Sequence, residues 1–215
     1  MIIGIDEAGR GPVIGPMVIS GVQIKKEDEE ALKGLEVKDS KLLTPKRREE
    51  LYKNIEKIAD NIKTITIDAQ TIDTLRKTKS LNVIELEAFA EIINNLKADK
   101  VYLDLPERNS DFAERLKAKV KRKIDLTAEH KADERYPVVS AASIIAKVTR
   151  DRIIKELEQQ IKEPIGSGYP SDPTTKQFLK NFYKKNKSFP PFVRHSWKTT
   201  KKITDQNKQS KLFGF

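Results

Sequence analysis

The sequence has no cysteine among its 215 residues, which excludes disulfide bonds, metal sites built on thiolates and a cysteine nucleophile. It also lacks a long apolar run. The longest uncharged stretch is interrupted by Pro12 and Pro16, whereas a membrane-spanning helix needs about 20 mostly apolar residues. The first residues carry two acids and no basic segment, which excludes a signal peptide. We therefore expect a cytoplasmic protein without a membrane segment.

Charge is abundant and unevenly distributed. Lys and Arg number 42 and Asp and Glu 32, for a net charge of +10. From Thr174 to Phe215 there are eleven basic residues and one acid, Asp205, so this segment holds the whole excess and the preceding part of the chain is neutral overall. A basic excess favours a polyanionic partner, most simply nucleic acid. Abundant Lys and Glu without cysteine are also typical of heat-adapted proteins.

Apolar periodicity predicts five strands with helices between and after them, which is the pattern of an α/β fold. Thr44-Pro45 and Asp172-Pro173 each place a capping side chain before a proline, so each predicts a helix start. The chain from residue 166 onward is interpreted as a helical appendage. We expect strands at 2–5, 17–24, 62–67, 101–105 and 124–128. We expect helices at 45–59, 71–97 in two pieces, 110–120 capped by Ser110, 137–162 and 173–185.

Carboxylates occur where apolar segments end. Asp6, Glu7 and Asp104 lie in or at the ends of predicted strands, and Asp133 precedes the apolar helix that begins at Pro137. Burying an unpaired carboxylate is costly, and several carboxylates around one cleft repel one another unless a divalent cation relieves the repulsion. All-oxygen ligands favour Mg²⁺ or Mn²⁺. Because adjacent strand residues face opposite sides, Asp6 and Glu7 can reach one site only if Glu7 lies beyond the strand end.

Alternatives stay open for these residues. Each acid alone is compatible with a solvated strand end or a helix cap, and the two histidines, His130 and His195, are more typical of structural or surface groups than of ligands. Ser143 and Lys147 lie one helical turn apart, as in a serine–lysine dyad. On so apolar a helix, packing or a substrate-facing position is the better interpretation.

The glycine loop after the first strand has the pattern G-x-G-x-x-x-G, from Gly9 to Gly15. In a dinucleotide-binding fingerprint the third glycine comes one residue earlier, and here Pro12 follows the second glycine. The acids before the loop would also repel a pyrophosphate, so a dinucleotide cofactor is not expected. The glycines still allow backbone N–H groups to approach a sugar or phosphate closely.

Several long motifs resemble type 2 ribonuclease H (ribonuclease HII), in its archaeal form. In the family's order they are IGIDEAGRGPVIGPMV, Asp39-Ser40-Lys41, VYLDLP, EHKADERYPVVSAASIIAKVTRD and GSGYPSDP, and they span the chain from Met1 to about Trp197. The resemblance implies an RNase H-like fold, with a mixed five-stranded sheet flanked by helices and a C-terminal helical subdomain. The implied parts are a catalytic domain at 1–165, a basic helical subdomain at 166–208 and a tail at 209–215.

The resemblance also implies an activity and its residues. An enzyme of this family cuts the RNA strand of RNA–DNA hybrids, including single ribonucleotides embedded in duplex DNA, by a two-metal-ion mechanism that leaves 5′-phosphates. This activity serves ribonucleotide excision and primer removal in DNA replication and repair. The implied catalytic metal ligands are Asp6, Glu7, Asp104 and Asp133. The implied substrate-binding residues are Gly9, Arg10, Gly11, Lys41, Ser143 and Tyr169. Backbone groups of the first three would contact the ribose 2′-hydroxyl, and the tyrosine would stack on the neighbouring sugar.

The C-terminal segment suggests two further contacts. Its lysines are expected to bind phosphates without sequence preference, while Phe178 and Phe182 are expected to pack inward. Gln209, Leu212 and Phe215 have the spacing of a shortened sliding-clamp-binding peptide. Such a peptide normally has two aromatic residues, and here the chain ends at the first. A frayed or locally packed terminus is the alternative.

Two other functions compete with this one. The first is another metal-dependent nuclease of the same fold, such as a junction resolvase or a DNA repair endonuclease, and activity on all-DNA substrates would identify it. The second is a catalytically silent nucleic-acid-binding protein, against which the complete set of four acids argues. Nothing in the sequence requires an oligomer, and we expect a monomer.

Overall fold

The computed structural model describes residues 1–35, 43–106 and 111–212, with the last five as backbone only. These residues form two compact units, each assembled from separate stretches of chain. The first unit contains 1–8, 18–66 and 80–149, and the second contains 9–17, 67–79 and 150–215. The glycine loop therefore belongs with the C-terminal part of the chain. The predicted boundaries at 165/166 and 208/209 stay predictions.

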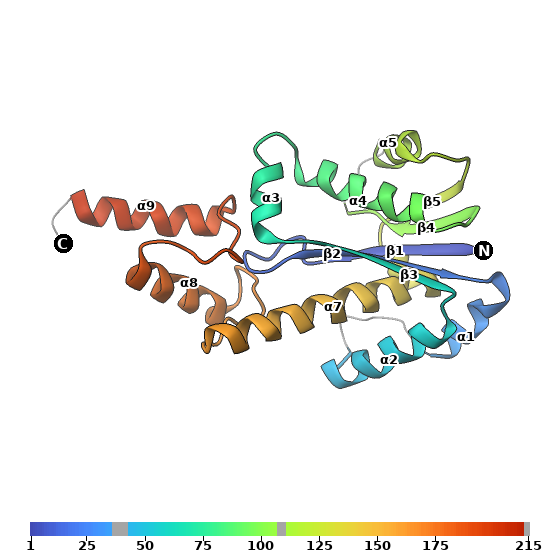
Figure 1. Cartoon of the computed structure of the whole chain (residues 1–215), viewed down its shortest axis with the longest axis horizontal. Coiled ribbons are helices and arrows are strands. Elements are labelled where there is room, and N and C mark those ends of the chain that lie inside the picture. Colours follow the sequence, from blue (N-terminus) through green and yellow to red (C-terminus); the bar gives the residue numbers. More distant parts are fainter. Residues whose placement is uncertain (36–42, 107–110, 213–215) are drawn as a thin grey trace. The chain divides into compact units, whose positions relative to one another are not determined.

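The first unit is built on a five-stranded sheet of order β3-β2-β1-β4-β5 (Figure 1). Its central strand, β1, is antiparallel to β2 and parallel to β4, and β4 is parallel to β5. The predicted mixed sheet is thus confirmed. The strands are β1 (Ile2–Ala8), β2 (Met17–Ile24), β3 (Asn61–Ile67), β4 (Lys100–Asp104) and β5 (Asp125–Glu129).

Helices cover both faces of this sheet (Figure 1). On one face, a methyl group at Gly21 would lie 2.3 Å from Ile92 of α4 (Leu81–Asn95). On the other, a methyl group at Gly4 would lie 2.2 Å from the backbone of Val138 in α7 (Pro137–Ile161). Glycine is required at Gly4 because the backbones of β1 and α7 touch there. The other helices of this unit are η1 (Lys26–Asp28), α1 (Glu29–Gly34), α2 (Pro45–Ile58), α5 (Phe112–Lys119) and α6 (Ala132–Arg135).

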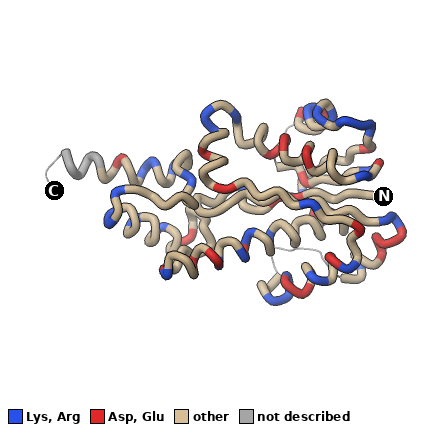
Figure 2. The backbone as a smooth tube through the Cα atoms, in the orientation of Figure 1, with Lys and Arg blue, Asp and Glu red and all other residues tan. Residues whose placement is uncertain are grey.

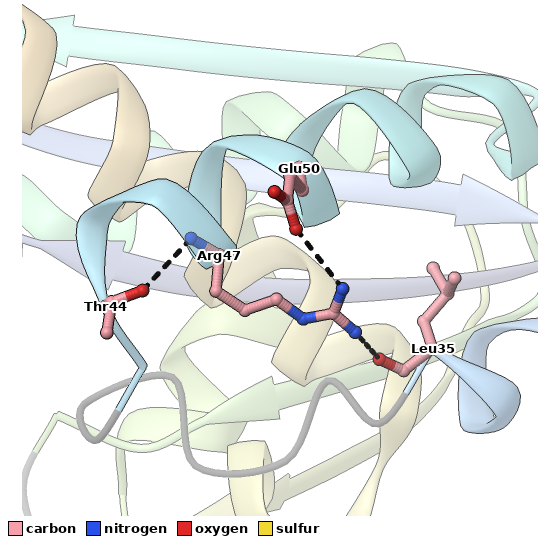
Figure 3. A network of polar contacts seen from close by, with 4 residues as sticks. All are labelled: Leu35, Thr44, Arg47 and Glu50. Carbon is pink, nitrogen blue, oxygen red and sulfur yellow. Dashed lines mark hydrogen bonds and ion pairs between the residues drawn. The ribbon is translucent and has the colours of Figure 1, made fainter.

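The start of α2 confirms the predicted capping motif (Figure 3). Thr44 Oγ1 accepts the N–H of Arg47 at 3.2 Å, and a proline occupies the first helical position. The Arg47 guanidinium lies 3.4 Å from Glu50 one turn along and donates to the carbonyl of Leu35 at 3.5 Å. The contact to Thr44 satisfies one of the N–H groups that a helix start otherwise leaves without a partner.

The second unit has its own apolar core, formed by the glycine loop and the helices after it. Val13 and Ile14 pack with Phe178 and Val193, and Phe182 adds to this cluster, as expected. The N–H groups of Val13 and Ile14 both donate to the carbonyl of Gly168. The unit's helices are α3 (Ala69–Leu75), α8 (Pro173–Asn186), α9 (Lys198–Leu212) and the part of α7 from residue 150 onward.

Several predicted boundaries need correction. The first strand continues to Ala8 rather than ending at Ile5. Residues 71–97 form two helices, as predicted, with α3 beginning at Ala69. The helix α5 has Asp111 as its N-cap residue, and Ser110 lies outside the described residues. Sequence periodicity missed α1, α6 and α9, which are short or weakly amphipathic. Among the described helices, none is both long and apolar enough to cross a membrane.

Candidate active site

Asp6 lies near the end of the central strand with 5% of its surface exposed. Alternate strand residues share a face, so Asp6 lies on the same face as Gly4, which contacts α7. Ser143 of α7, itself buried, hydrogen-bonds the Asp6 carboxylate, and Asp6 Oδ1 accepts the N–H of Glu7 at 2.7 Å. The structure therefore places Ser143 beside a predicted catalytic acid.

Glu7 does not lie beyond the strand end. It is part of β1 and pairs with Ile19 of β2, so the condition derived from strand alternation is not met in this structure. The charge of Glu7 nevertheless acts on Asp6. Alternation sets the direction of two neighbouring side chains, but their backbones remain adjacent, and like charges at short range interact through a poorly screened interior.

The register of the sheet brings a third acid to the same end. Ile5 of β1 pairs with Leu103 of β4 in parallel, so Asp104, the last residue of β4, comes level with Asp6. Asp104 Oδ1 accepts the N–H of Ala132 at 2.7 Å. This bond ties the short helix α6 to the end of β4, and the next residue of α6 is the buried Asp133.

The fourth acid, Asp133, is held by a contact from α7. The hydroxyl of Ser140 donates to the backbone carbonyl of Asp133. Since Ser140 and Ser143 lie on the same helix, α7 supports both Asp133 and Asp6. All four predicted acids thus belong to the first unit, at strand ends or beside them.

The electrostatics of this cluster are unfavourable as they stand. The pKa of Asp6 is raised well above its ordinary 3.8, first by burial, then by the charge of Glu7 and then by the charge of Asp104. The hydrogen bonds from Ser143 and from the N–H of Glu7 lower the pKa, but they do not cancel these effects. A buried carboxylate with two further carboxylates beside it is a donor set that a divalent cation suits.

Two of the four acid side chains, those of Asp6 and Asp104, are hydrogen-bonded to backbone N–H groups. In each, one carboxylate oxygen accepts the hydrogen bond, from Glu7 in the case of Asp6 and from Ala132 in the case of Asp104. Within residues 1–35, 43–106 and 111–212, no group of three or more carboxylates or histidines is arranged as it stands to hold a metal ion. His130 and His195 are both exposed. The donor chemistry therefore fits a cation, and side-chain rotation would be needed to enclose it.

The predicted substrate residues of the glycine loop lie in the second unit, around a buried arginine. Arg194 has 0% of its surface exposed and donates to three carbonyls of this loop. Its Nη2 lies 2.6 Å from the carbonyl oxygen of Gly9, its Nη1 3.1 Å from that of Arg10 and its Nε 3.0 Å from that of Gly15. Gly9 has φ +90°, a conformation that favours glycine.

Tyr169 lies against the same loop. A methyl group at Gly11 would lie 3.5 Å from the Tyr169 ring. Tyr169 itself has 40% of its surface exposed. The Arg150 guanidinium stands 5.6 Å from the centre of that ring. The loop that carries Tyr169 is held by Asp172, whose carboxylate accepts the N–H and hydroxyl of Ser167, both at 2.7 Å. The second unit thus gathers Gly9, Arg10, Gly11 and Tyr169 as one group.

Four other predicted site residues lie outside the described residues or are described by their backbone alone. Lys41 and Phe215 lie outside the described residues. Gln209 and Leu212 belong to the last turns of α9, of which only the backbone is described.

Sequence reasoning missed the buried arginines Arg150 and Arg194 and the acid Asp73. Asp73 of α3 accepts the N–H groups of His195 at 2.6 Å and Ser196 at 2.9 Å. Arginine is rarely fully buried, and nothing in the local sequence singles out Arg150 among the chain's many basic residues. For Arg194 the available signal was the FVRHSW segment, in which aromatic residues lie on both sides of a single arginine.

The chain is similar to known proteins over nearly its whole length. The family model described as Ribonuclease HII matches residues 3–200. A ribonuclease HII of Methanococcus maripaludis (strain C7) is 49% identical over 219 residues, covering 99% of this chain and 91% of the relative. The ribonuclease H2 structure of Pyrococcus horikoshii OT3 matches with a TM-score of 0.90 and 44% identity, covering 97% of this chain and 99% of that one.

A further structure similar to this chain is that of the PCNA:RNase HII complex from Archaeoglobus fulgidus. Its TM-score is 0.87 at 42% identity, and the match covers 94% of this chain and 96% of that chain.

Proposed function

The chain belongs to the ribonuclease HII family, whose members are nucleases acting on RNA–DNA hybrids, and we propose that it cleaves at ribonucleotides through divalent cations held by its acid cluster. The proposed ligands are Asp6, Glu7, Asp104 and Asp133. The proposed substrates include single ribonucleotides embedded in duplex DNA, so that the enzyme would serve ribonucleotide excision and primer removal.

The sheet register that brings Asp104 level with Asp6 and next to Glu7 carries this proposal. Asp6 is buried, and the charges of the other two acids raise its pKa. When bound there, two Mg²⁺ or Mn²⁺ ions supply the charge that stabilises the attacking and leaving oxygens of phosphodiester hydrolysis, which leaves a 5′-phosphate. The chain's own contribution is to orient the carboxylates. Ser143 holds Asp6, and the Ala132 N–H holds Asp104.

The glycine loop and Tyr169 are the proposed substrate-reading parts. The 2′-hydroxyl is the chemical group that distinguishes a ribonucleotide from its deoxy counterpart, and it can both donate and accept a hydrogen bond. Backbone groups of Gly9, Arg10 and Gly11 can contact it closely, and the exposed Tyr169 ring next to Gly11 can stack on a sugar. Lys41 joins this set from the family resemblance.

Lysines of the second unit are the proposed phosphate contacts. Figure 2 shows that Lys and Arg outnumber Asp and Glu along α8 and the described part of α9, whereas α1, α2 and α5 of the first unit carry both signs. Such contacts bind a duplex without reading its sequence, and their affinity falls as salt rises.

Substitution of Asp6 by Asn tests the cation site. We expect cleavage of a duplex with one embedded ribonucleotide, in Mg²⁺ or Mn²⁺, to fall at least about a hundredfold, because a neutral amide cannot replace a ligand that stabilises the developing charge. Isothermal titration calorimetry with Mn²⁺ should show weaker binding. The matched control is Glu114→Gln, an exposed acid on α5, which should cleave at the wild-type rate. Wild-type turnover by Asp6→Asn would refute the assignment.

Substitution of Tyr169 by Ala tests the stacking role. Cleavage at a single ribonucleotide should fall more than cleavage of a continuous hybrid, because a long hybrid offers many registers and depends less on one stacked sugar. Equal losses on the two substrates would contradict this role. Cleavage of an all-DNA duplex by the wild type would instead favour the competing repair-nuclease function.

The C-terminal residues Gln209, Leu212 and Phe215 are the proposed contacts to a sliding clamp. Their spacing supports this, and so does the likeness to the Archaeoglobus fulgidus enzyme, which was solved in complex with PCNA. Deletion of residues 209–215 should abolish binding to a purified archaeal clamp in surface plasmon resonance while hybrid cleavage stays unchanged. Unchanged clamp binding would overturn the proposal.

A further inference from the structure

The buried guanidinium of Arg194 donates hydrogen bonds to backbone carbonyls of the glycine loop. Each of its three nitrogens donates to a different carbonyl, those of Gly15, Arg10 and Gly9, at 3.0, 3.1 and 2.6 Å. A planar guanidinium is a rigid fork of donors, so three such bonds fix the carbonyls relative to one another.

Trp197 extends the same arrangement by one residue. Its indole Nε1–H donates to the carbonyl of Gly11 at 3.0 Å, and its ring lies 4.7 Å from the Arg194 guanidinium carbon. The carbonyls of three successive residues, Gly9, Arg10 and Gly11, are therefore all held by two neighbouring side chains.

Holding the carbonyls also orients the amides. No peptide bond among the described residues is cis. In a trans peptide the C=O of one residue and the N–H of the next point in opposite directions. With the carbonyls of Gly9 and Arg10 directed at Arg194, the N–H groups of Arg10 and Gly11 are directed away from it. The residue after Gly11 is Pro12, which has no N–H, so the outward donors from this stretch end at Gly11.

We propose that Arg194 is a positioning residue for substrate selection, which sets the N–H groups of Arg10 and Gly11 so that they discriminate a ribose 2′-hydroxyl from a deoxyribose. This inference rests on the proposed reading of ribonucleotides by the glycine loop. It adds that the reading depends on a side chain that is itself fully buried and makes no contact with the nucleic acid.

The surroundings of Arg194 support a precise rather than a merely space-filling role. Asp73 holds the two residues after it through the N–H groups of His195 and Ser196. A buried charge is costly, and an apolar residue would fill the site at lower cost. Lysine offers a point charge with rotatable donors and cannot reproduce the three-way fork.

The test compares binding of two duplexes that differ by one 2′-hydroxyl. The affinity ratio, ribonucleotide-containing over all-DNA, is measured by fluorescence anisotropy in an Asp6→Asn background, so that neither duplex is cleaved. Adding Arg194→Lys should reduce the ratio by about tenfold, since one or two hydrogen bonds to the hydroxyl lose their alignment. In the otherwise wild-type enzyme, the same substitution should lower kcat/KM at a single ribonucleotide.

A matched control separates positioning from stability. Phe178→Leu weakens the apolar core of the second unit without touching the held carbonyls. It should lower the melting temperature but leave the affinity ratio unchanged. If Arg194→Lys also leaves the ratio unchanged, or if Phe178→Leu reduces it equally, the inference is overturned.

Two further results keep the test decisive. If Arg194→Lys does not fold, Trp197→Phe removes the indole N–H to Gly11 and the larger ring beside the Arg194 guanidinium. The guanidinium is then less firmly placed, and the ratio should fall by a smaller factor. An unchanged ratio there overturns the inference. If the protein without these substitutions shows no preference for the ribonucleotide, the proposed reading by the loop has failed, and the role of Arg194 falls with it.

Discussion

Each unit contains a buried group whose charge is repelled by like charges beside it, Asp6 in the first and Arg194 in the second, and the two groups differ in what surrounds them. In the first, Glu7 and Asp104 raise the pKa of Asp6. In the second, burial and the charge of Arg150 lower the pKa of Arg194 to about 9. The arginines point their N–H groups at carbonyls supplied by their own unit. The two contacts that lower the pKa of Asp6 come from neutral groups, the Ser143 hydroxyl and the Glu7 N–H, and they do not offset its burial and the repulsion.

This difference indicates which cluster is structural and which one awaits a ligand. A charge solvated by fixed dipoles of the fold should stabilise the protein as it is. A charge that is repelled should destabilise the protein until a cation arrives. A variant that neutralises the buried arginine should therefore lower the stability of the protein, and one that neutralises the buried acid should raise it in the absence of metal.

The largest effect is expected for Arg150→Met in the second unit. Arg150 has 1% of its surface exposed and donates to the carbonyls of Ile14 at 3.1 Å and Ser167 at 3.3 Å. Methionine would leave these acceptors without donors, at a cost of about 1–3 kcal/mol each, partly offset by removal of a buried charge. Urea denaturation should show a lower free energy of unfolding. Arg152→Met, on the exposed side of the same helix, is the control and should change it little. A higher free energy of unfolding for Arg150→Met than for the wild type would contradict the structural role of the buried arginines.

A smaller effect of opposite sign is expected for Asp6→Asn without metal. The folded-state pKa of Asp6 lies above its ordinary 3.8, so stability falls as pH rises through the interval between these values. Asparagine is neutral at every pH and avoids that loss. At pH 7 in EDTA the variant should melt about 2–4 °C higher than the wild type. Mn²⁺ should raise the melting temperature of the wild type and narrow or reverse this difference. A lower melting temperature for the variant in EDTA would show that Asp6 is already stabilised internally.

A modest effect on binding is expected for Lys184→Ala, near the end of α8 and exposed. If the lysine contacts a phosphate, the slope of log affinity against log salt should become less steep by about one, while turnover at saturating hybrid stays unchanged. Lys57→Ala in α2 of the first unit is the control. The same change of slope in both variants would mean that the duplex does not favour the basic unit.

The smallest effect is expected at Asp172, whose pKa is lowered to about 2, chiefly by the N–H and hydroxyl of Ser167. A folded-state pKa below the ordinary 3.8 means that the carboxylate contributes stability above that pH. This contribution is lost as pH falls toward 2. Between pH 5 and 2 the melting temperature should therefore fall more for the wild type than for Asp172→Asn, which keeps a capping oxygen but no charge. Parallel melting curves would contradict this.

Local sequence signals predicted most of the elements. The capping residues Thr44 and Asp172 before prolines marked helix starts that the structure confirms, because both signals act within one turn. The five strands were found at nearly their true positions. The exit of β1 was misjudged because Asp6 and Glu7 are poor strand residues in isolation, and pairing with β2 extends the strand through both.

The four acids and the glycine loop could be singled out from the sequence alone, since carboxylates in apolar runs and glycines in a tight turn are unusual wherever they occur. The sequence did not show which of these residues lie close together in space, because that depends on the strand register and on the Ala132 N–H that binds Asp104. Only the tertiary structure revealed that the loop belongs with residues from 150 onward, and that Arg194, far away in the chain, orients it. The reason is physical: a motif's chemistry is carried by its own residues, whereas the contacts that aim it join segments whose distance in sequence holds no information about their distance in space.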